Sequence, residues 1–200
     1  MTKIKLCGLS RKEDILCANE LLPDYIGFVF AKGSRRYVAP DRALALRELI
    51  DSRIKVVGVL VDEDEEKTAS YVSAGIIDIV QLHGSEDEEY IGKLRALGVN
   101  EIIKAFKIGS REDIETAAAS SADYILLDSG QGGGRVFDWD LIGSLRRPYF
   151  LAGGLDCENV TEAVNYLAPY AVDVSSGIEN YGIKDADKMR KFVRAVRSVG

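Results

Sequence analysis

The chain has 200 residues, of which 46% are hydrophobic and 29% charged, a composition typical of a globular protein that can bury a core. Its formal net charge of -6 disfavours nucleic acid and anionic membrane surfaces as partners, because both are themselves negatively charged. Three cysteines (Cys7, Cys17 and Cys157) without a C-x-x-C pair, and one histidine, His83, predict neither a disulfide framework nor a Cys/His metal site.

Short apolar runs alternate along the chain with longer amphipathic segments. The runs recur every 20 to 30 residues or so, which is the spacing of strand–helix units. They are β-branched and apolar on both faces, as expected for parallel strands that are covered on both sides. We therefore predict strands at residues 4–7, 25–30, 55–61, 77–82, 101–106, 124–127, 149–152 and 171–174.

Helix-start signals lie between these runs. Ser10 and Ser85 are each followed three residues later by a glutamate, which predicts capping boxes, and similar patterns begin at Asp62 and Ser110. Each signal comes within a few residues of a predicted strand end, as a strand–helix repeat requires.

Two further helices are predicted from their apolar spacing. One runs over residues 40–50, opened by a proline, with Leu44, Leu46 and Leu49 on or near its inner face. The other runs over residues 184–199 and closes the chain, with core-facing residues at helical spacing: Met189, Phe192, Val193 and Val196.

Eight strand–helix repeats fit either a doubly wound open sheet or a closed barrel. An open sheet that binds a dinucleotide usually carries G-x-G-x-x-G after its first strand, whereas residues 7–10 read Cys-Gly-Leu-Ser. Eight regular repeats without a linker favour the barrel, so we predict an α/β fold with one (β/α)8 TIM-barrel domain over residues 1–200. Every strand would then end at one mouth, where barrel enzymes place their active sites.

Neither a secretory signal nor a membrane span is predicted. Residues 1–7 lack the long apolar core of a signal peptide, and no apolar run approaches the roughly 18 residues of a spanning helix. We expect a reduced, cytoplasmic protein.

Two predicted strand ends carry reactive groups. The sixth ends in Asp128, which is followed by a glycine-rich loop, and the first ends in Cys7. A carboxyl and a thiol on opposite sides of a barrel mouth could serve as a proton donor and acceptor. From the residues alone, Asp128 could equally be a helix cap or loop carboxylate, and Cys7 a small buried apolar residue. Lys5, two residues before Cys7, would point into the barrel and favour its thiolate.

Seven short motifs, in order and in spacing, resemble the phosphoribosylanthranilate isomerase family along essentially the whole chain. They lie at residues 5–10 (KLCGLS), 27–30 (GFVF), 34–37 (SRRY), 81–84 (QLHG), 137–139 (FDW), 152–155 (AGGL) and 172–177 (VDVSSG). The resemblance implies a (β/α)8 barrel of tryptophan biosynthesis. It implies an Amadori rearrangement of N-(5-phosphoribosyl)anthranilate to 1-(2-carboxyphenylamino)-1-deoxyribulose 5-phosphate, without metal or cofactor.

The resemblance also implies roles for individual residues. Asp128 would be the general acid and Cys7 the general base, while Arg36, in preference to Arg35, would hold the anthranilate carboxylate. The phosphate would bind after the last two strands, at Gly153, Gly154, Ser176 and Gly177, where barrels often place phosphate.

Other positions are given supporting roles. Gly132, Gly133 and Gly134 resemble the family's mobile loop and form a possible lid, although they replace a pattern that commonly includes Ser or Thr. Asp173 is predicted to face inward, with Lys5 as its partner, because a buried carboxylate needs one. His83 is expected to support the site rather than to act as the acid or base.

Alternatives remain at this point. One is another sugar-phosphate barrel enzyme, similar to indole-glycerol-phosphate synthase or to the histidine-pathway isomerase. The synthase would require a catalytic lysine and glutamates at strand ends, and the isomerase an aspartate in place of Cys7. Another is a non-catalytic sugar-phosphate binding protein, which would have no need of Cys7 and Asp128. The expected partner is a phosphosugar, and a homodimer is possible.

Overall fold

A computed structural model describes residues 1–130, 138–143 and 145–199 of the chain. Eight parallel strands close into a barrel in sequence order, and β8 pairs back onto β1. The strands are β1 (Lys3–Cys7), β2 (Tyr25–Val29), β3 (Lys55–Leu60), β4 (Ile79–Leu82), β5 (Ile102–Lys107), β6 (Tyr124–Asp128), β7 (Tyr149–Leu151) and β8 (Ala171–Val174). Each lies within about two residues of its predicted position, so the prediction of a (β/α)8 barrel is confirmed.

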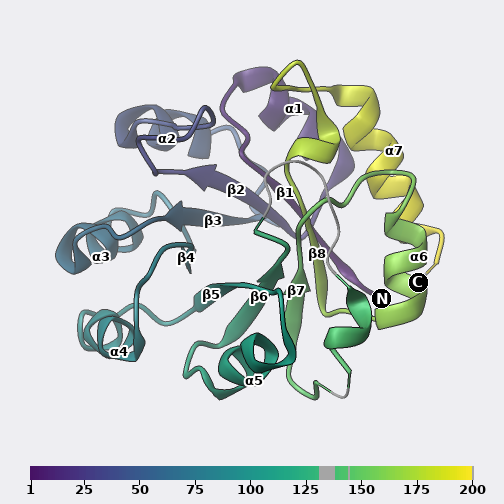
Figure 1. Cartoon of the computed structure of the whole chain (residues 1–200). Coiled ribbons are helices and arrows are strands. Elements are labelled where there is room, and N and C mark those ends of the chain that lie inside the picture. The colour runs from purple at the N-terminus through teal and green to yellow at the C-terminus, as the bar shows by residue number, and fades with distance from the viewer. Residues whose placement is uncertain (131–137, 144, 200) are drawn as a thin grey trace.

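Helices surround the barrel on its outside (Figure 1). They are α1 (Lys12–Leu21), α2 (Pro40–Arg47), α3 (Glu65–Ser73), α4 (Glu88–Ala96), α5 (Arg111–Ala119), α6 (Val160–Leu167) and α7 (Ala186–Arg197). In the described part of the β6–β7 connection the only helical element is a short 3-10 turn, η1 (Trp139–Leu141). A second such turn, η2 (Ser176–Ile178), follows β8 and leads into a small hairpin of β9 (Glu179–Asn180) and β10 (Ile183–Lys184).

The helix starts differ from three of the four predicted caps. Ser110 does form a capping box with Asp113, as predicted. The cap of α1 is Arg11 rather than Ser10, and the caps of α3 and α4 are Asp64 and Asp87, two residues after the predicted ones. In α3 and α4 the aspartate accepts the backbone N–H three residues on, which satisfies a donor that the first helical turn leaves free.

Two predicted helices are shorter than expected. α2 ends at Arg47, and Leu46 faces the core, but Leu44 and Leu49 are exposed, so their predicted inward orientation is wrong. The last helix begins at Ala186 because Asp185 caps it. Its four apolar residues are buried as predicted: Met189, Phe192, Val193 and Val196.

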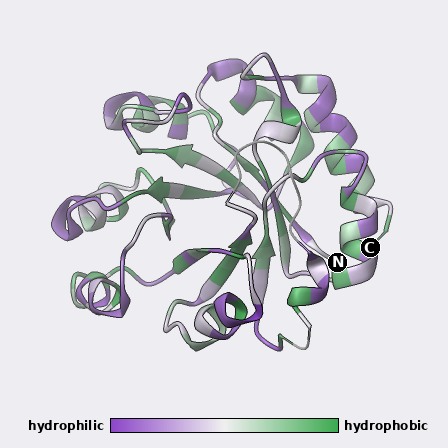
Figure 2. Ribbon diagram, viewed as in Figure 1, coloured by the Kyte–Doolittle hydropathy of each residue, from purple (hydrophilic) through white to green (hydrophobic). Residues whose placement is uncertain are grey.

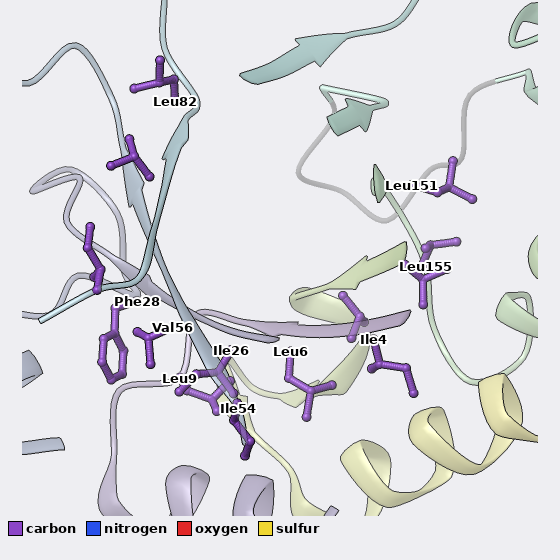
Figure 3. Close-up of a cluster of buried hydrophobic side chains, with 14 of the residues drawn as sticks. Ile4, Leu6, Leu9, Ile26, Phe28, Ile54, Val56, Leu82, Leu151 and Leu155 are labelled. Atoms are coloured by element: carbon purple, nitrogen blue, oxygen red, sulfur yellow. The ribbon is translucent and has the colours of Figure 1, made fainter. Parts of the chain in front are cut away.

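The main core lies between the strands and the helices. Outward-facing residues of adjacent strands meet there, and Figure 3 shows Ile4 and Leu6 of β1 together with Ile26 and Phe28 of β2. Hydropathy follows the same plan, since the strands are largely apolar and the polar residues gather on the helices (Figure 2). This arrangement covers both faces of every strand, which explains why the strands read as continuous apolar runs.

A second apolar cluster fills the barrel itself, with Val57, Ile79, Ile103 and Leu126 among its members. At the amino ends of the strands, Tyr124 stacks on Tyr170 with ring centroids 4.9 Å apart, and Lys3 Nζ donates to the Tyr170 hydroxyl at 2.9 Å. The filled interior leaves the carboxyl ends of the strands as the place for a site. None of the helices in the described ranges combines the length and apolar character that a membrane crossing needs.

Candidate active site

A cavity of about 370 Å³ opens at the carboxyl ends of the strands. Its lining comes from β1, β2, β3, β4, β6, β7 and β8 or the loops that follow them. The lining residues are Cys7, Val29, Ala31, Ser34, Arg36, Val59, Val61, Gln81, His83, Asp128, Gly130, Ala152, Gly153, Gly154, Leu155, Asp173, Ser175 and Ser176. The sequence-predicted thiol, carboxylate and guanidinium are therefore brought together in one cavity.

Cys7 is the last residue of β1 and is buried beside Val29 and Val59. Burial raises the pKa of its thiol, and this effect outweighs the Lys5 ammonium, which lowers it. Lys5 thus favours the thiolate, as the sequence suggested, but does not bring the thiol pKa below its ordinary value. Burial thus favours the neutral thiol over the thiolate at Cys7.

Asp128 is the last residue of β6, and its carboxylate makes a local turn. Its Oδ1 accepts the backbone N–H of Gly130 at 2.9 Å, so the loop reading of this residue is partly correct. Gly153 packs closely against it: a Cβ there would lie 2.9 Å from Asp128 Oδ1 and 2.5 Å from the Ser129 backbone nitrogen. Asp128 Oδ2 faces His83 Nε2 at 3.7 Å.

A row of polar side chains crosses the barrel below this pair. Lys5 Nζ donates to Asp173 Oδ2 at 2.7 Å, which confirms that ion pair, and also to Gln81 Oε1 at 2.6 Å. Gln81 Nε2 lies 3.0 Å from His83 Nδ1. Gln81 is therefore a site residue that sequence reasoning missed, although its place two residues before His83 on β4 puts both side chains on one face.

Arg36 lines the cavity and is held by Glu179. Its Nε and Nη2 donate to the two carboxylate oxygens of Glu179 at 2.6 and 3.0 Å. Arg35 also contacts Glu179, at 2.9 Å, but its side chain is mostly exposed and is not part of the lining. Glu179, which the sequence did not suggest, thus orients Arg36 through a bidentate pair.

Glu179 gathers a third cation, Lys184, whose Nζ lies 2.7 Å from Glu179 Oε1 and 2.8 Å from the Ser175 backbone oxygen. Burial would raise the pKa of Glu179, but the hydrogen bonds from Arg36 and Lys184 lower it to about 2. One carboxylate facing three cations leaves this side of the mouth net positive, which favours an anionic ligand.

The predicted phosphate residues lie in two neighbouring loops. Gly153 and Gly154 follow β7 with φ of 83° and 72°, a conformation that glycine adopts readily. Within the described ranges, their backbone N–H groups donate to no other backbone oxygen. Ser176 opens η2 and lines the cavity.

Gly177 has a different place. It is not among the lining residues; a Cβ on it would lie 2.0 Å from the Leu155 backbone oxygen. Its contribution is to let η2 pack against the loop after β7. The predicted lid, Gly132, Gly133 and Gly134, lies outside the described residues.

A closed barrel of eight strands, with a thiol, a carboxylate and a guanidinium around a cavity at their carboxyl ends, defines an enzyme of the (β/α)8-barrel class. The sequence model of the family described as N-(5'phosphoribosyl)anthranilate (PRA) isomerase matches residues 4–195. The chain belongs to this family.

Individual relatives agree with the family match. The N-(5'-phosphoribosyl)anthranilate isomerase of Endomicrobium trichonymphae is 43% identical over 204 residues and covers both chains completely. A crystal structure of phosphoribosyl anthranilate isomerase in complex with reduced 1-(o-carboxyphenylamino)-1-deoxyribulose 5-phosphate has a TM-score of 0.89 and 36% identity, covering 99% of this chain and 100% of that one.

A third relative is a structure of monomers generated from the dimeric phosphoribosylanthranilate isomerase of Thermotoga maritima. It has a TM-score of 0.88 and 36% identity, over 99% of this chain and all of that one. These matches favour this family over the other sugar-phosphate barrels and the non-catalytic binding protein that the sequence left open.

Proposed function

We propose that this chain converts N-(5'-phosphoribosyl)anthranilate into 1-(2-carboxyphenylamino)-1-deoxyribulose 5-phosphate, with Asp128 as general acid and Cys7 as general base. The observation that carries the proposal is that both side chains line one cavity, from strands β6 and β1, beside the anchored guanidinium of Arg36. The enzyme would serve tryptophan biosynthesis as an aldose–ketose isomerase.

The first step opens the sugar ring. Asp128 transfers its proton to the furanose ring oxygen, the bond from C1 to that oxygen breaks, and the nitrogen lone pair forms the C1 iminium. Asp128 Oδ1 is engaged by the Gly130 N–H, so Oδ2, on the side of His83, is the oxygen available to carry the proton. Asp128 becomes a carboxylate in this step.

The second step removes a proton from C2. The thiolate of Cys7 takes the proton, the C–H electrons form the C1–C2 double bond, and the iminium nitrogen is neutralised as an enolamine, which tautomerises to the ketone. The positive charge on the iminium would favour the Cys7 thiolate at this moment, opposing the effect of burial. Lys5 adds a permanent charge of the same sign.

Two anchors would hold the substrate. The Arg36 guanidinium, oriented by Glu179, suits the planar anthranilate carboxylate. The phosphate would bind at Gly153, Gly154 and Ser176. The N–H groups of Gly153 and Gly154 donate to no backbone oxygen of the described residues, and the net positive surroundings favour an anion. Gly177 would support this phosphate site by its close packing.

The direct test follows the loss of anthranilate fluorescence as substrate is consumed. Asp128→Asn and Cys7→Ala should each lower kcat by about 10² to 10⁴, the range for a lost general acid or base. Cys17→Ala is the matched control, because Cys17 is a buried thiol in α1 that does not line the cavity. Wild-type activity in Asp128→Asn would overturn the acid assignment.

The pH profile tests Cys7 separately. The active form needs Asp128 protonated and Cys7 ionised, so kcat/KM should be level through neutral pH and should fall above the pKa of Cys7, which burial places beyond about 8.5, the ordinary value for a thiol. Cys7→Asp replaces the thiol with a base that is ionised over this range, so its profile should lose this basic limb. A profile with the same basic limb in both proteins would assign that limb to another group.

Several coarser expectations belong with this proposal. We propose that residues 1–200 form one domain, that the enzyme is cytoplasmic, and that it needs neither metal nor cofactor and binds no nucleic acid. A homodimer is supported by the dimeric relative from Thermotoga maritima. Size-exclusion chromatography with light scattering tests the oligomeric state directly.

A further inference from the structure

The hydrogen-bond donors and acceptors of Lys5, Gln81 and His83, in the row of polar side chains across the barrel, can be assigned in only one way. Lys5 is fully buried, and its ammonium can only donate. It lies 2.6 Å from the side-chain amide of Gln81, which is itself buried. The atom of Gln81 facing Lys5 must therefore be the oxygen, and this fixes the orientation of the amide.

The orientation of the Gln81 amide determines which ring nitrogen of His83 carries the proton. Gln81 Nε2, which can only donate, faces His83 Nδ1 at 3.0 Å. Nδ1 must then accept and carry no proton, so the neutral ring carries its proton on Nε2, the nitrogen 3.7 Å from Asp128 Oδ2. Asp173 anchors the other end of the row by pairing with Lys5 at 2.7 Å.

We propose that Lys5 and Gln81 hold His83 as the neutral imidazole with its proton on Nε2, so that this N–H faces the carboxyl of Asp128. Gln81 is then a positioning residue that acts on the acid through His83. The inference for catalysis rests on the proposed acid role of Asp128, whereas the tautomer itself does not.

This arrangement has two consequences for an acid at Asp128. The dipole of the N–H on Nε2, which lies 3.7 Å from Asp128 Oδ2 and so beyond hydrogen-bond distance, favours the carboxylate that Asp128 becomes after it has given up its proton. The same N–H occupies the nitrogen nearest the acid, so His83 cannot take the Asp128 proton at that position. An imidazole protonated on Nδ1 would turn a lone pair toward Asp128. It would disfavour the carboxylate, and it could take the Asp128 proton on Nε2.

The charge on His83 is governed by its surroundings as well as by Gln81. The charged groups that act on it are Asp128 on β6, Lys5 on β1, Asp173 on β8 and Glu86 after β4. Partial burial, the largest influence, lowers the pKa of His83 below its ordinary value, in keeping with a neutral ring.

The chain has one histidine, so the imidazole signals in a nitrogen NMR spectrum of the whole protein come from His83 and need no further assignment. In 15N-labelled wild type at neutral pH, a long-range proton–nitrogen correlation should show Nε2 protonated and Nδ1 bare. A proton on Nδ1 in the wild type, or a rapidly exchanging mixture of tautomers, would overturn the proposal.

Variants at Gln81 test the cause. Gln81→Glu keeps the shape but turns the donor toward Nδ1 into an acceptor, so the proton should move to Nδ1 or the ring should become charged. Asn165→Asp makes the same amide-to-carboxylate change on the exposed face of α6 and should leave the ring as in wild type. Gln81→Met, which removes the donor without adding charge, should give a tautomer mixture. An unchanged spectrum in both Gln81 variants would also overturn the proposal.

Kinetics then separate this proposal from the assignment of the acid. Gln81→Met should lower kcat about tenfold with little change in KM, and should cost nothing further in an Asp128→Asn background. His83→Gln, which keeps an N–H donor, should retain more activity than His83→Leu. If the tautomer is as expected but Asp128→Asn is fully active, the acid role fails and the hydrogen-bonded row stands. If Asp128→Asn is inactive and the tautomer is wrong, only the row fails.

Discussion

Gly27 lies opposite Cys7 in the β1–β2 ladder, and a Cβ at Gly27 would lie 2.7 Å from Cys7 Sγ. The thiol thus occupies space that only a glycine on the neighbouring strand leaves open. The position of the proposed base is set by a residue that takes no part in the chemistry.

Gly27→Ala should therefore displace the Cys7 thiol and lower kcat/KM by as much as about a hundredfold, since displacements near 1 Å can have that effect. Gly33→Ala is the matched control, because no atom of the described residues lies within 4 Å of a Cβ at that site. Steady-state kinetics and circular dichroism on both variants separate a moved thiol from lost folding. Equal activity of the two variants would show that Cys7 tolerates the shift.

Glu179→Gln should weaken substrate binding. The amide cannot form the charged bidentate pair with Arg36, so the guanidinium loses its fixed orientation. We expect KM to rise about tenfold with a smaller change in kcat, because the anthranilate carboxylate is bound in both ground and transition states.

The control for that variant is Glu20→Gln, which removes the exposed ion pair with Arg190 and should leave both kinetic constants unchanged. A fall in kcat at constant KM in Glu179→Gln would instead connect Glu179 with the chemical step.

Glu179 should also contribute to stability in a particular pH range. Its pKa is about 2 in the folded protein against an ordinary value of 4.5, so folding favours its charged form. This stabilisation, up to about 3 kcal/mol, is fully present above pH 4.5 and is lost as the pH falls through 2.

Urea denaturation of wild type and Glu179→Gln at several pH values measures this contribution. The difference between their free energies of unfolding should shrink steadily between pH 4.5 and 2. A difference that stays constant over this range would mean that Glu179 stabilises the fold by packing rather than by charge.

Lys5→Met should destabilise the protein strongly, because it leaves the Asp173 carboxylate buried without its cation. Loss of one partner of a buried pair costs about 3–5 kcal/mol. The double variant Lys5→Met/Asp173→Leu should recover most of that loss. The remaining destabilisation would come from the Gln81 amide oxygen, which loses its hydrogen bond from Lys5. Urea midpoints for the two variants give the comparison, and no recovery in the double variant would contradict the charge argument.

The sequence predicted the strands well and the helix boundaries less well, for physical reasons. A strand buried on both faces is a continuous apolar run, so its limits are visible locally, as in residues 55–60. Helix caps are ambiguous because serine, threonine and aspartate are common near every helix start; Asp64 follows Asp62 by only two residues. The predicted helix over residues 40–50 ran too long because its apolar residues continue past the last helical turn.

The site divides in a similar way. Cys7 and Asp128 could be predicted because they are chemically distinctive and stand at strand ends. Gln81 and Glu179 could not, because their roles arise from contacts across 76 and 143 residues of sequence, with Lys5 and Arg36. A glutamine and a glutamate carry no local signal of such a role; the fold supplies it.

The β6–β7 connection also carries the chain's one tryptophan, Trp139, at the start of η1. Its indole is partly buried against the core, and within the described residues its Nε1 has no hydrogen-bond partner. Tryptophan emits light at wavelengths that anthranilates absorb. Occupancy of the barrel mouth should therefore be visible as quenching of the chain's one tryptophan, which would allow binding to be followed in inactive variants without any label.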